Sequence, residues 1–278
     1  MTRFLEGQVA LVTGAGRGLG RAFAEHLAAA GAKIGVHGMR EQGPSEYGEG
    51  TTLTDTAREI GEFGQVQTLK VLADLTDGEH VERIVSEVTQ QLGPIDILVH
   101  NAGGDIAALG GKPDPNDAVM ISPDDIKAVL DRNLLTTILV CRDVARRMIQ
   151  RNEQSSENPS QGGRIITISS IAAFTGTAQG AIYATAKAGQ VAYTRSLAQQ
   201  LRPHNITVNS LAPGDTRTGR FMNTRDVDQQ RMVTEGTLER IATVDEVARV
   251  VEFFAGPLGQ FVTGQTVRVD GGHQAWSA

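Results

Sequence analysis

Apolar residues along the chain follow two alternating patterns. Short continuous runs, many of them rich in β-branched residues, occupy positions 9–13, 33–38, 66–71, 95–99, 164–169, 206–211 and 265–269. Between these runs, apolar residues recur every three or four positions at 17–30, 52–63, 78–92, 122–150, 181–201 and 244–254. Short buried strands that alternate with amphipathic helices are typical of βαβ units in a parallel sheet.

This alternation continues along the chain without a break in composition or an internal repeat. A length of 278 residues would allow two domains, but α/β folds of about 250 residues often form a single unit. We therefore predict an α/β protein in which residues 1–278 form one domain. Its fold is a Rossmann-type, doubly wound, seven-stranded parallel sheet with helices on both faces.

Four segments are longer than the connections usual in such folds. They span residues 39–50, 103–121, 151–163 and 215–240. The second ends at Ser122-Pro123, a helix N-cap followed by a proline at the first helical position. We expect segments 103–121 and 215–240 to border a substrate cleft.

Composition and charge exclude several classes of protein. Lys and Arg number 26 against 32 Asp and Glu, which gives a net charge of −6 without a large basic cluster, so nucleic-acid binding is not expected. The first residues lack the apolar core of a secretory signal, and no run is long enough to span a membrane. The single cysteine, Cys141, favours a reducing, cytoplasmic location.

Glycine is over-represented, with 32 residues, and three of them follow the first predicted strand. Gly14, Gly18 and Gly20 have the spacing G-x-x-x-G-x-G, directly before the first predicted helix. Glycines allow a tight turn here, and the N–H groups of a helix N-terminus bind a pyrophosphate. The segment therefore predicts dinucleotide binding; the alternative is a glycine-rich turn without a ligand.

The end of the second predicted strand bears on the choice of dinucleotide. NAD sites usually place a carboxylate there, whereas NADP sites place an arginine near the 2′-phosphate. The strand ends Gly38-Met39-Arg40, and the first acid is Glu41. Arg17 and Arg40 favour NADP(H), with NAD(H) possible; alternatively, both are ordinary surface arginines.

A tyrosine and a lysine share one face of a predicted helix. Tyr183 and Lys187 are four residues apart, and a cation one turn away lowers the pKa of a phenol, which is ordinarily ~10. Ser169 and Ser170 end a strand at the sheet edge where such folds bind ligands. The tyrosine–lysine pair by itself is a weak signal, because such spacings are common in helices.

Taken together, these motifs resemble the short-chain dehydrogenase/reductase family. The resemblance covers nearly the whole chain, in order. It rests on the glycine-rich segment, Asn101-Ala102-Gly103, Asn133, Ser170 thirteen residues before Tyr183, Tyr183-x-x-x-Lys187 and Pro213-Gly214. It implies a compact NAD(P)(H)-dependent oxidoreductase that interconverts a ketone and a secondary alcohol by hydride transfer, with NADP preferred.

The resemblance also implies a catalytic set of Asn133, Ser170, Tyr183 and Lys187. Tyr183 would be the general acid/base, and Lys187 would lower its pKa and hold the nicotinamide ribose. Ser170 would hydrogen-bond the reacting oxygen, and Asn133 would anchor a water on the proton route. Two alternatives stay open: Ser169 could replace Ser170, and Asn133 could be an ordinary helix residue.

The residues implied to contact the cofactor lie after several of the predicted strands and, for Tyr183 and Lys187, in the helix 181–201. Asp74 would contact the adenine and Thr218 the carboxamide, although Asp74 could instead cap the next helix. His100 stands where the family often has asparagine, and Thr216 where it has isoleucine or valine. The full set is Gly14, Arg17, Gly18, Leu19, Arg40, Asp74, Leu75, Asn101, Ala102, Gly103, Tyr183, Lys187, Pro213, Gly214, Thr216 and Thr218.

Other functions fit the sequence less well. The six histidines show no metal-binding spacing, and Gly-x-Ser-x-Gly and P-loop motifs are missing, so no metal site is expected. A catalytically silent dinucleotide-binding redox sensor would not need the catalytic set. An epimerase or dehydratase would need more chain than follows Pro213.

The substrate is left between two classes. A small polar carbonyl or polyol is one, and a 3-oxoacyl thioester is the other; an NAD-preferring sugar or polyol dehydrogenase is a further alternative. The family resemblance also implies a homo-oligomer, either a tetramer or a dimer. Its expected contacts are helices 122–150 and 181–201 and the last strand.

Overall fold

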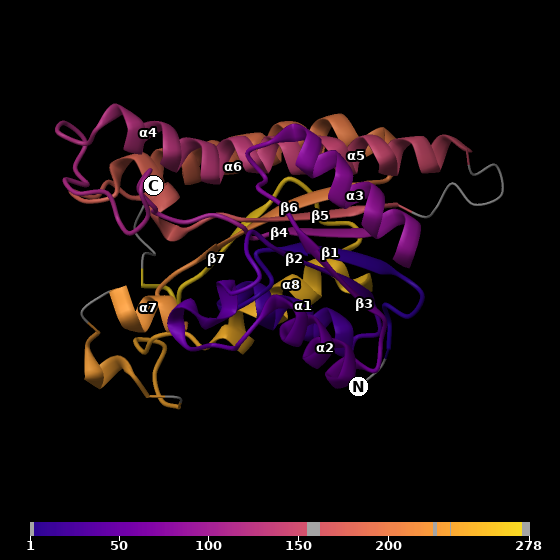
Figure 1. Ribbon diagram of the computed structural model, residues 1–278, viewed down its shortest axis with the longest axis horizontal. Coiled ribbons are helices and arrows are strands. Elements are labelled where there is room, and N and C mark those ends of the chain that lie inside the picture. Colours follow the sequence, from indigo (N-terminus) through magenta and orange to yellow (C-terminus); the bar gives the residue numbers. More distant parts are fainter. Residues whose placement is uncertain (1–2, 155–161, 225–226, 234, 274–278) are drawn as a thin grey trace.

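The computed structural model describes residues 3–154, 162–224, 227–233 and 235–273. Within them, seven strands form one parallel sheet with the order β3-β2-β1-β4-β5-β6-β7 (Figure 1). The strand order reverses between β1 and β4, the place where doubly wound sheets bind their ligands. The predicted fold is confirmed. The strands are β1 (Val9–Thr13), β2 (Lys33–Gly38), β3 (Thr68–Leu72), β4 (Ile97–His100), β5 (Arg164–Ile168), β6 (Thr207–Pro213) and β7 (Thr266–Val269).

Helices cover both faces of the sheet, and each face has its own hydrophobic core. On one face pack α1 (Gly18–Ala29), α2 (Leu53–Gly64) and α8 (Val244–Ala255). On the other lie α3 (Gly78–Leu92), α5 (Thr136–Gln154) and α6 (Ala181–Leu201). No helix in the described part of the chain is long and apolar enough to cross a membrane.

The predicted helix 122–150 is wrong as one regular element. It begins with α4 (Pro123–Leu130), capped by the Ser122 hydroxyl, which accepts a hydrogen bond from the Asp125 amide. A π-helical turn, Asp131–Leu135, then precedes α5, which continues to Gln154. Such turns widen a helix by one residue and often occur at functional sites. This one carries Asn133.

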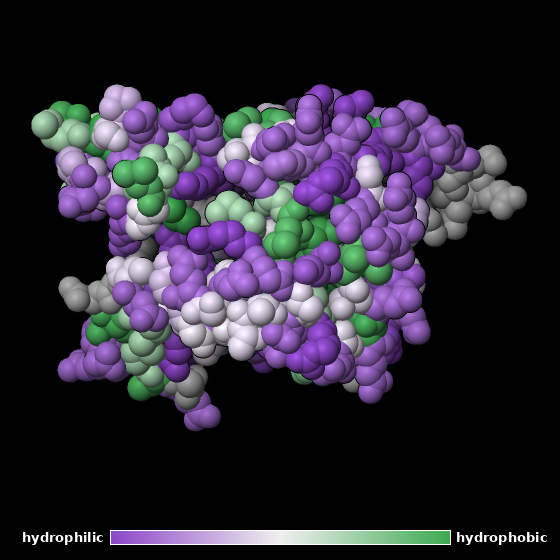
Figure 2. Space-filling view, viewed as in Figure 1, coloured by the Kyte–Doolittle hydropathy of each residue, from purple (hydrophilic) through white to green (hydrophobic). Residues whose placement is uncertain are grey.

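The long connections contain short structured elements. Segment 39–50 includes a 3₁₀ turn at Gly43–Tyr47, and segment 215–240 includes α7 (Gly219–Thr224). Segment 103–121 and α7 lie beyond the carboxyl ends of the strands (Figure 1). The surface is hollowed between these two parts of the molecule, at the left of Figure 2. Most of segment 151–163 falls outside the described residues.

The packing of α1 against α2 depends on a glycine at the contact. A Cβ placed on Gly64, at the end of α2, would lie 2.6 Å from the carbonyl carbon and the Cβ of Ala28 in α1. The helices can therefore approach this closely only if residue 64 is glycine.

Gly64→Ala should destabilise the protein by about 1–3 kcal/mol, because the added methyl forces the two helices apart. Chemical denaturation gives the free energy of unfolding. Gly78→Ala is the matched control, since a Cβ there, in the first turn of α3, meets no atom within 4 Å. Equal stabilities for the two variants would contradict this account of the packing.

Candidate active site

The segment after β1 adopts a backbone that requires glycine. Gly14 and Gly18 have φ angles of 65° and 53°, in the left-handed region. A Cβ on Gly20 would lie only 2.0 Å from the Gly14 carbonyl oxygen. The spacing noted in the sequence thus reflects one compact turn, with the start of α1 against the end of β1.

The N-terminus of α1 is open to an anion. Arg17 is the N-cap residue, but its side chain makes no capping hydrogen bond, and no acid occupies the first turn of this described helix. Free N–H groups and the helix dipole therefore point toward the turn. A dinucleotide pyrophosphate fits this site, because it supplies the negative charge and acceptors that the helix end lacks.

The exit of β4 is joined to the glycine turn by hydrogen bonds. The Thr13 hydroxyl accepts from the amides of Asn101 and Ala102, at 3.0 and 3.1 Å. The side-chain nitrogen of Asn101, Nδ2, donates to the Gly14 carbonyl at 3.2 Å. Asn101-Ala102-Gly103 and the glycine turn therefore form one continuous edge at the switch point.

Two buried histidines support this edge, and the sequence prediction assigned neither of them a role. His37 Nδ1 accepts from the Gly14 amide at 3.2 Å, and its Nε2 lies 3.1 Å from the Ala73 carbonyl, which only accepts. His100 Nδ1 lies 3.2 Å from the Thr13 hydroxyl. Burial lowers the pKa of His37 to about 4 and that of His100 to about 3, so both rings are neutral.

Tyr183 and Lys187 lie together on α6. The Lys187 ammonium nitrogen is 5.6 Å from the centroid of the Tyr183 ring and donates to the Ile168 carbonyl at 2.8 Å. The Lys187 side chain is buried, which lowers its pKa to about 7. Lys187 is therefore a proton-exchanging group near neutral pH, one turn from the phenol.

The two serines after β5 have different surroundings. The Ser169 hydroxyl is buried and donates to the Lys187 carbonyl at 2.9 Å. Ser170 Oγ accepts from the Ala172 amide at 3.2 Å, and no described residue accepts its hydroxyl hydrogen. Ser169 fastens β5 to α6, whereas Ser170 keeps a donor available.

Asn133 connects the π-helical turn to the segment after β4. Its side chain exchanges two hydrogen bonds with Gly104 and donates a third to the Val129 carbonyl. Its main-chain oxygen accepts from Thr137 at 2.6 Å and from Gln190 at 3.0 Å. The sequence offered no signal for Gln190 beyond its place on the Lys187 face of the helix.

The residues after β6 complete the rim of the cleft. A Cβ on Gly18 would lie 3.4 Å from Thr218, so this threonine borders the glycine turn. Thr216 is buried and donates to the Gly214 carbonyl at 3.0 Å, which fixes the bend after Pro213. The structure thus brings the predicted cofactor-contacting residues that follow β6 close to those that follow β1.

Asp74 and Leu75, which were expected near the adenosine, lie just after β3. Asp74 accepts from the amide and hydroxyl of Thr76, and Asp77 is the residue that caps α3. The alternative that Asp74 caps this helix is therefore wrong. Leu75 is buried and Leu19 is half-buried beside the glycine turn.

The two arginines expected near a 2′-phosphate differ in how firmly their side chains are held. Arg17 donates to the Gly43 carbonyl and to Glu46, at 2.7 and 2.8 Å, and stacks on the Tyr47 ring. Arg40 reaches Glu46 only at 3.4 Å, and 64% of its side chain is exposed. Segment 39–50 therefore holds Arg17 firmly and Arg40 weakly.

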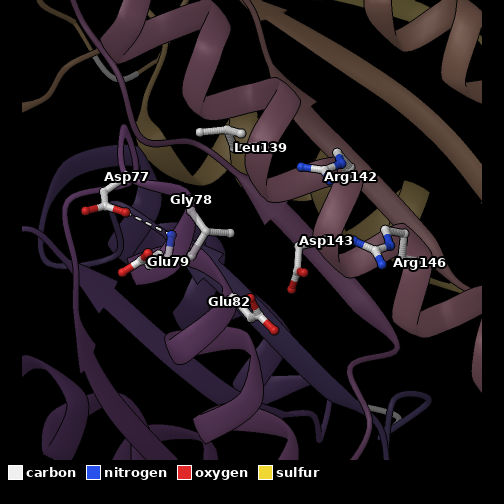
Figure 3. Close-up of a pocket in the computed structure, with 9 residues that line it drawn as sticks. Asp77, Gly78, Glu79, Glu82, Leu139, Arg142, Asp143 and Arg146 are labelled. Atoms are coloured by element: carbon white, nitrogen blue, oxygen red, sulfur yellow. Dashed lines mark hydrogen bonds between the residues drawn. The ribbon is translucent and has the colours of Figure 1, made fainter.

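A hollow of about 510 Å³ lies elsewhere, between α3 and α5 (Figure 3). Asp77, Glu79 and Glu82 line it on one side, and Arg142 and Arg146 on the other. No described residue that lines it belongs to the predicted site. Across the described ranges, no group of three or more His, Cys, Asp or Glu is placed to hold a metal ion.

Comparisons with known proteins agree with this geometry. A family model described as short chain dehydrogenase matches residues 8–229. The chain is 35% identical over 277 residues to a cyclohexanol dehydrogenase of Rhodococcus sp. (strain TK6), covering 96% of both chains. It is 34% identical to a 3-oxoacyl-[acyl-carrier-protein] reductase of Aquifex aeolicus (strain VF5), covering 96% of this chain and 98% of the relative.

Solved structures give the same result. A 7 alpha-hydroxysteroid dehydrogenase complexed with NADH and 7-oxo glycochenodeoxycholic acid is 27% identical, with a TM-score of 0.79, and covers 98% of this chain and 96% of its own. A levodione reductase is 26% identical, with a TM-score of 0.81, and covers 98% of this chain and 99% of its own.

Acid should destabilise the protein through His37 and His100. Below about pH 6.5 the unfolded imidazoles bind protons, but the folded ones stay neutral until about pH 4 and 3, so stability falls as the pH drops through this window. Each histidine should cost on the order of 2 kcal/mol by about pH 5. Urea denaturation at about pH 8 and pH 5 measures this loss.

His37→Gln should lose less stability between the two pH values than the wild type, because glutamine does not titrate. His80→Gln, at an exposed position of α3, is the control and should keep the wild-type pH dependence. A His37→Gln protein with the full acid loss would refute the role assigned to this ring.

Proposed function

Because the chain belongs to the short-chain dehydrogenase/reductase family and is an oxidoreductase that acts on CH–OH groups, we propose that it interconverts a ketone and a secondary alcohol. The observation that carries the proposal is the arrangement of Lys187, Tyr183 and Ser170. Lys187 and Tyr183 share a helix face, with the lysine Nζ 5.6 Å from the centroid of the tyrosine ring. Ser170 has a hydroxyl hydrogen to donate.

Tyr183 is the general acid/base in this proposal. In the direction of reduction, its hydroxyl gives a proton to the substrate oxygen; in oxidation, the phenolate takes that proton back. A cationic Lys187 favours the phenolate. Its own pKa of about 7 lets it exchange a proton near neutrality, so the pair can reset after each turnover.

Ser170 orients the reacting oxygen. Its Oγ is positioned by the hydrogen bond from the Ala172 amide, and its hydrogen remains available to donate. A preorganised donor of this kind stabilises the charge that develops on the oxygen in the transition state. We assign the role to Ser170 rather than to Ser169, whose hydrogen is already used by Lys187.

We propose that Asn133 acts mainly by holding the segment after β4 in place. Its side chain fixes Gly104, directly after Asn101-Ala102-Gly103, through hydrogen bonds of 2.9 Å in each direction. The family resemblance implies that Asn133 would anchor a water, but its side chain is held by Gly104 and Val129 and its main-chain carbonyl already accepts from Thr137 and Gln190. Proton exchange at Lys187 is therefore proposed to depend less on Asn133 than the resemblance implies.

The proposed cofactor is a nicotinamide dinucleotide, which supplies or accepts the hydride when bound. Gly14, Gly18 and the open end of α1 would hold its pyrophosphate. Thr218 would lie near the carboxamide, and Asp74 near the adenine. Lys187 would also hold the ribose, beside the tyrosine.

We propose that NADP(H) is preferred over NAD(H). Arg40 is mostly exposed after β2, where a 2′-phosphate would lie. The nearest acid, Glu41, does not compete as a ribose ligand, because it already accepts from Thr54 and pairs with Lys70 at 3.0 Å.

The proposed substrate is a small polar carbonyl or polyol, with a 3-oxoacyl thioester as the second class. We also propose a cytoplasmic homo-oligomer, a dimer or tetramer. Exposed apolar side chains on α8, on the turn after it and on the edge strand β7 support assembly: Phe253, Leu258, Phe261 and Val267.

Tyr183→Phe should lower kcat by about 10²–10⁴-fold, because the phenylalanine ring cannot exchange a proton. Affinity for the dinucleotide, measured by fluorescence titration, should be nearly unchanged. Initial rates over a panel of ketones and alcohols give the activity. Tyr193→Phe, in the same helix, is the matched control and should stay close to the wild type.

Near-normal turnover by Tyr183→Phe would overturn the assigned mechanism. A wild-type protein that binds the dinucleotide but oxidises and reduces nothing on the panel would support the redox-sensor alternative instead.

Arg40→Ala should raise KM for NADPH about tenfold and leave KM for NADH unchanged, since one charge-assisted hydrogen bond to the phosphate is lost. Parallel steady-state assays with the two cofactors measure this. Arg58→Ala, on the exposed side of α2, is the charge-matched control. A wild-type preference for NADH, or an equal effect on both cofactors, would contradict the NADP assignment.

A further inference from the structure

Asp105 lies where three segments of the candidate cleft meet. Its main-chain oxygen accepts from the Arg220 guanidinium of α7 at 2.9 Å. Its carboxylate Oδ2 accepts from the Asn116 side-chain nitrogen at 2.7 Å. A Cβ on Gly180, the residue before α6, would lie 3.6 Å from the same oxygen. Tyr183 follows in the first turn of α6, so Asp105 lies near the start of the helix that carries the proposed acid/base.

Asn116 fixes the far end of this loop to α6. Its main-chain oxygen accepts from the Gly180 amide at 2.7 Å, and its side chain is only 9% exposed. Segment 103–121 is therefore folded back on itself, with Asp105 and Asn116 side by side. This pair, hereafter the Asp105–Asn116 pair, is built by residues eleven positions apart.

The pair presents two oxygen atoms that lack a donor. Asp105 Oδ1 and Asn116 Oδ1 are both buried and have no hydrogen-bond partner in the structure described here. Burying an unsatisfied polar atom costs about 1–3 kcal/mol, so most such atoms in folded proteins are paired. Both atoms are acceptors, because an ionised carboxylate and an amide oxygen only accept. A ligand that completes this site must bring a donor.

The charges around the pair decide between a hydroxyl and an ammonium. The guanidinium of Arg220 lies against Gly104, where a Cβ would be 2.2 Å from its Nη1. Arg132 donates to the carbonyls of Ile106 and Ala107 in the same loop. Both guanidiniums thus contact the backbone of the loop that carries this single carboxylate, and because they repel a further cation, a neutral donor is favoured. The carboxylate likewise disfavours an anionic group.

We propose that the Asp105–Asn116 pair determines specificity by accepting a hydrogen bond from a second hydroxyl of the substrate, separate from the one that is oxidised. The substrate class is then a diol, or in reverse a hydroxyketone, rather than a 3-oxoacyl thioester. This inference rests on the proposed function, since it concerns the same cleft. Asp105 touches the substrate without taking part in proton or hydride transfer.

Both oxygens are enclosed in the ligand-free chain, so the proposal requires this loop to open, and α7 is an element that contacts it. The two elements are connected by the Arg220 bond to Asp105 and by a Lys112 bond of 3.3 Å to the Thr224 carbonyl. Both are single hydrogen bonds from flexible side chains to the backbone, so the separation breaks no packed core.

The test compares alcohols that differ by one hydroxyl. Oxidation of cyclohexanol and of cis- and trans-1,2-cyclohexanediol is measured on the full chain with its preferred cofactor. A parallel set uses 2-butanol and 2,3-butanediol. In at least one set, the diol should have a kcat/KM at least ~30-fold above that of the mono-alcohol, because a buried acceptor rejects an analogue without the donor.

Asp105→Ala should bring the kcat/KM for the diol to within about threefold of that for the mono-alcohol, because only the activity on the diol falls. Asp105→Asn, which keeps the shape of the side chain, should also lower the ratio and decides the matter where the alanine variant is unstable. Asp124→Ala, at an exposed acid of α4, is the control and should keep the wild-type ratio. Equal rates on diols and mono-alcohols, or equal losses on both in Asp105→Ala, overturn the proposal.

A wild-type protein that oxidises none of these alcohols with either cofactor contradicts the proposed function, and binding then decides the inference separately. Thermal unfolding with saturating NADPH is followed as 1,2-cyclohexanediol or cyclohexanol is added. A diol-specific rise in Tm that disappears in Asp105→Asn supports the pair. No diol-specific rise in the wild type refutes it.

Discussion

The close approach of two backbone turns, after β1 and after β4, is the constraint on which the site depends. A Cβ on Gly14 would lie 3.1 Å from the Ala102 Cα, and the Thr13 hydroxyl binds the amides of residues 101 and 102. A side chain at position 14 would have to push the two turns apart by a few tenths of an ångström, in a left-handed backbone that favours glycine. Glycine at this position therefore keeps the open end of α1 against the Asn101-Ala102-Gly103 edge.

Neutral hydrogen-bonding groups hold the two turns together without burying a charge in the core. His37 and His100 act as one-donor, one-acceptor groups behind the turns, much as an asparagine would. Charging either ring would remove its acceptor and place an unpaired cation in the core. Lys187 is the exception, since its lowered pKa leaves it able to change charge where the proposed chemistry needs it.

The sequence predicted the sheet because its central strands, such as β1 and β4, are buried along their whole length and form continuous apolar runs. It pointed to Tyr183, Lys187 and Ser170 through the family resemblance, because helix spacing alone made the tyrosine–lysine pair a weak signal and did not separate Ser170 from Ser169. The π-helical turn was not predictable, since α4 and α5 each keep their own apolar repeat and the turn between them is only five residues long. Asp105 was missed because an acid in a glycine-rich loop resembles a solvated one, and only its tertiary contact with Asn116 distinguishes it.

Segment 39–50 bears on the proposed cofactor preference through its contacts with two arginines. Glu46 is shared by Arg17 and Arg40, and exposed ion pairs of this kind contribute about 0–1 kcal/mol. A hydrogen bond from an arginine to a phosphate contributes about 1.5–3 kcal/mol, so a 2′-phosphate can displace Glu46 from Arg40. Arg17 is also held by the Gly43 carbonyl and the Tyr47 ring, and would have to give up all three contacts. The proposed preference for NADP(H) therefore depends on Arg40, although both arginines lie at this end of the cleft.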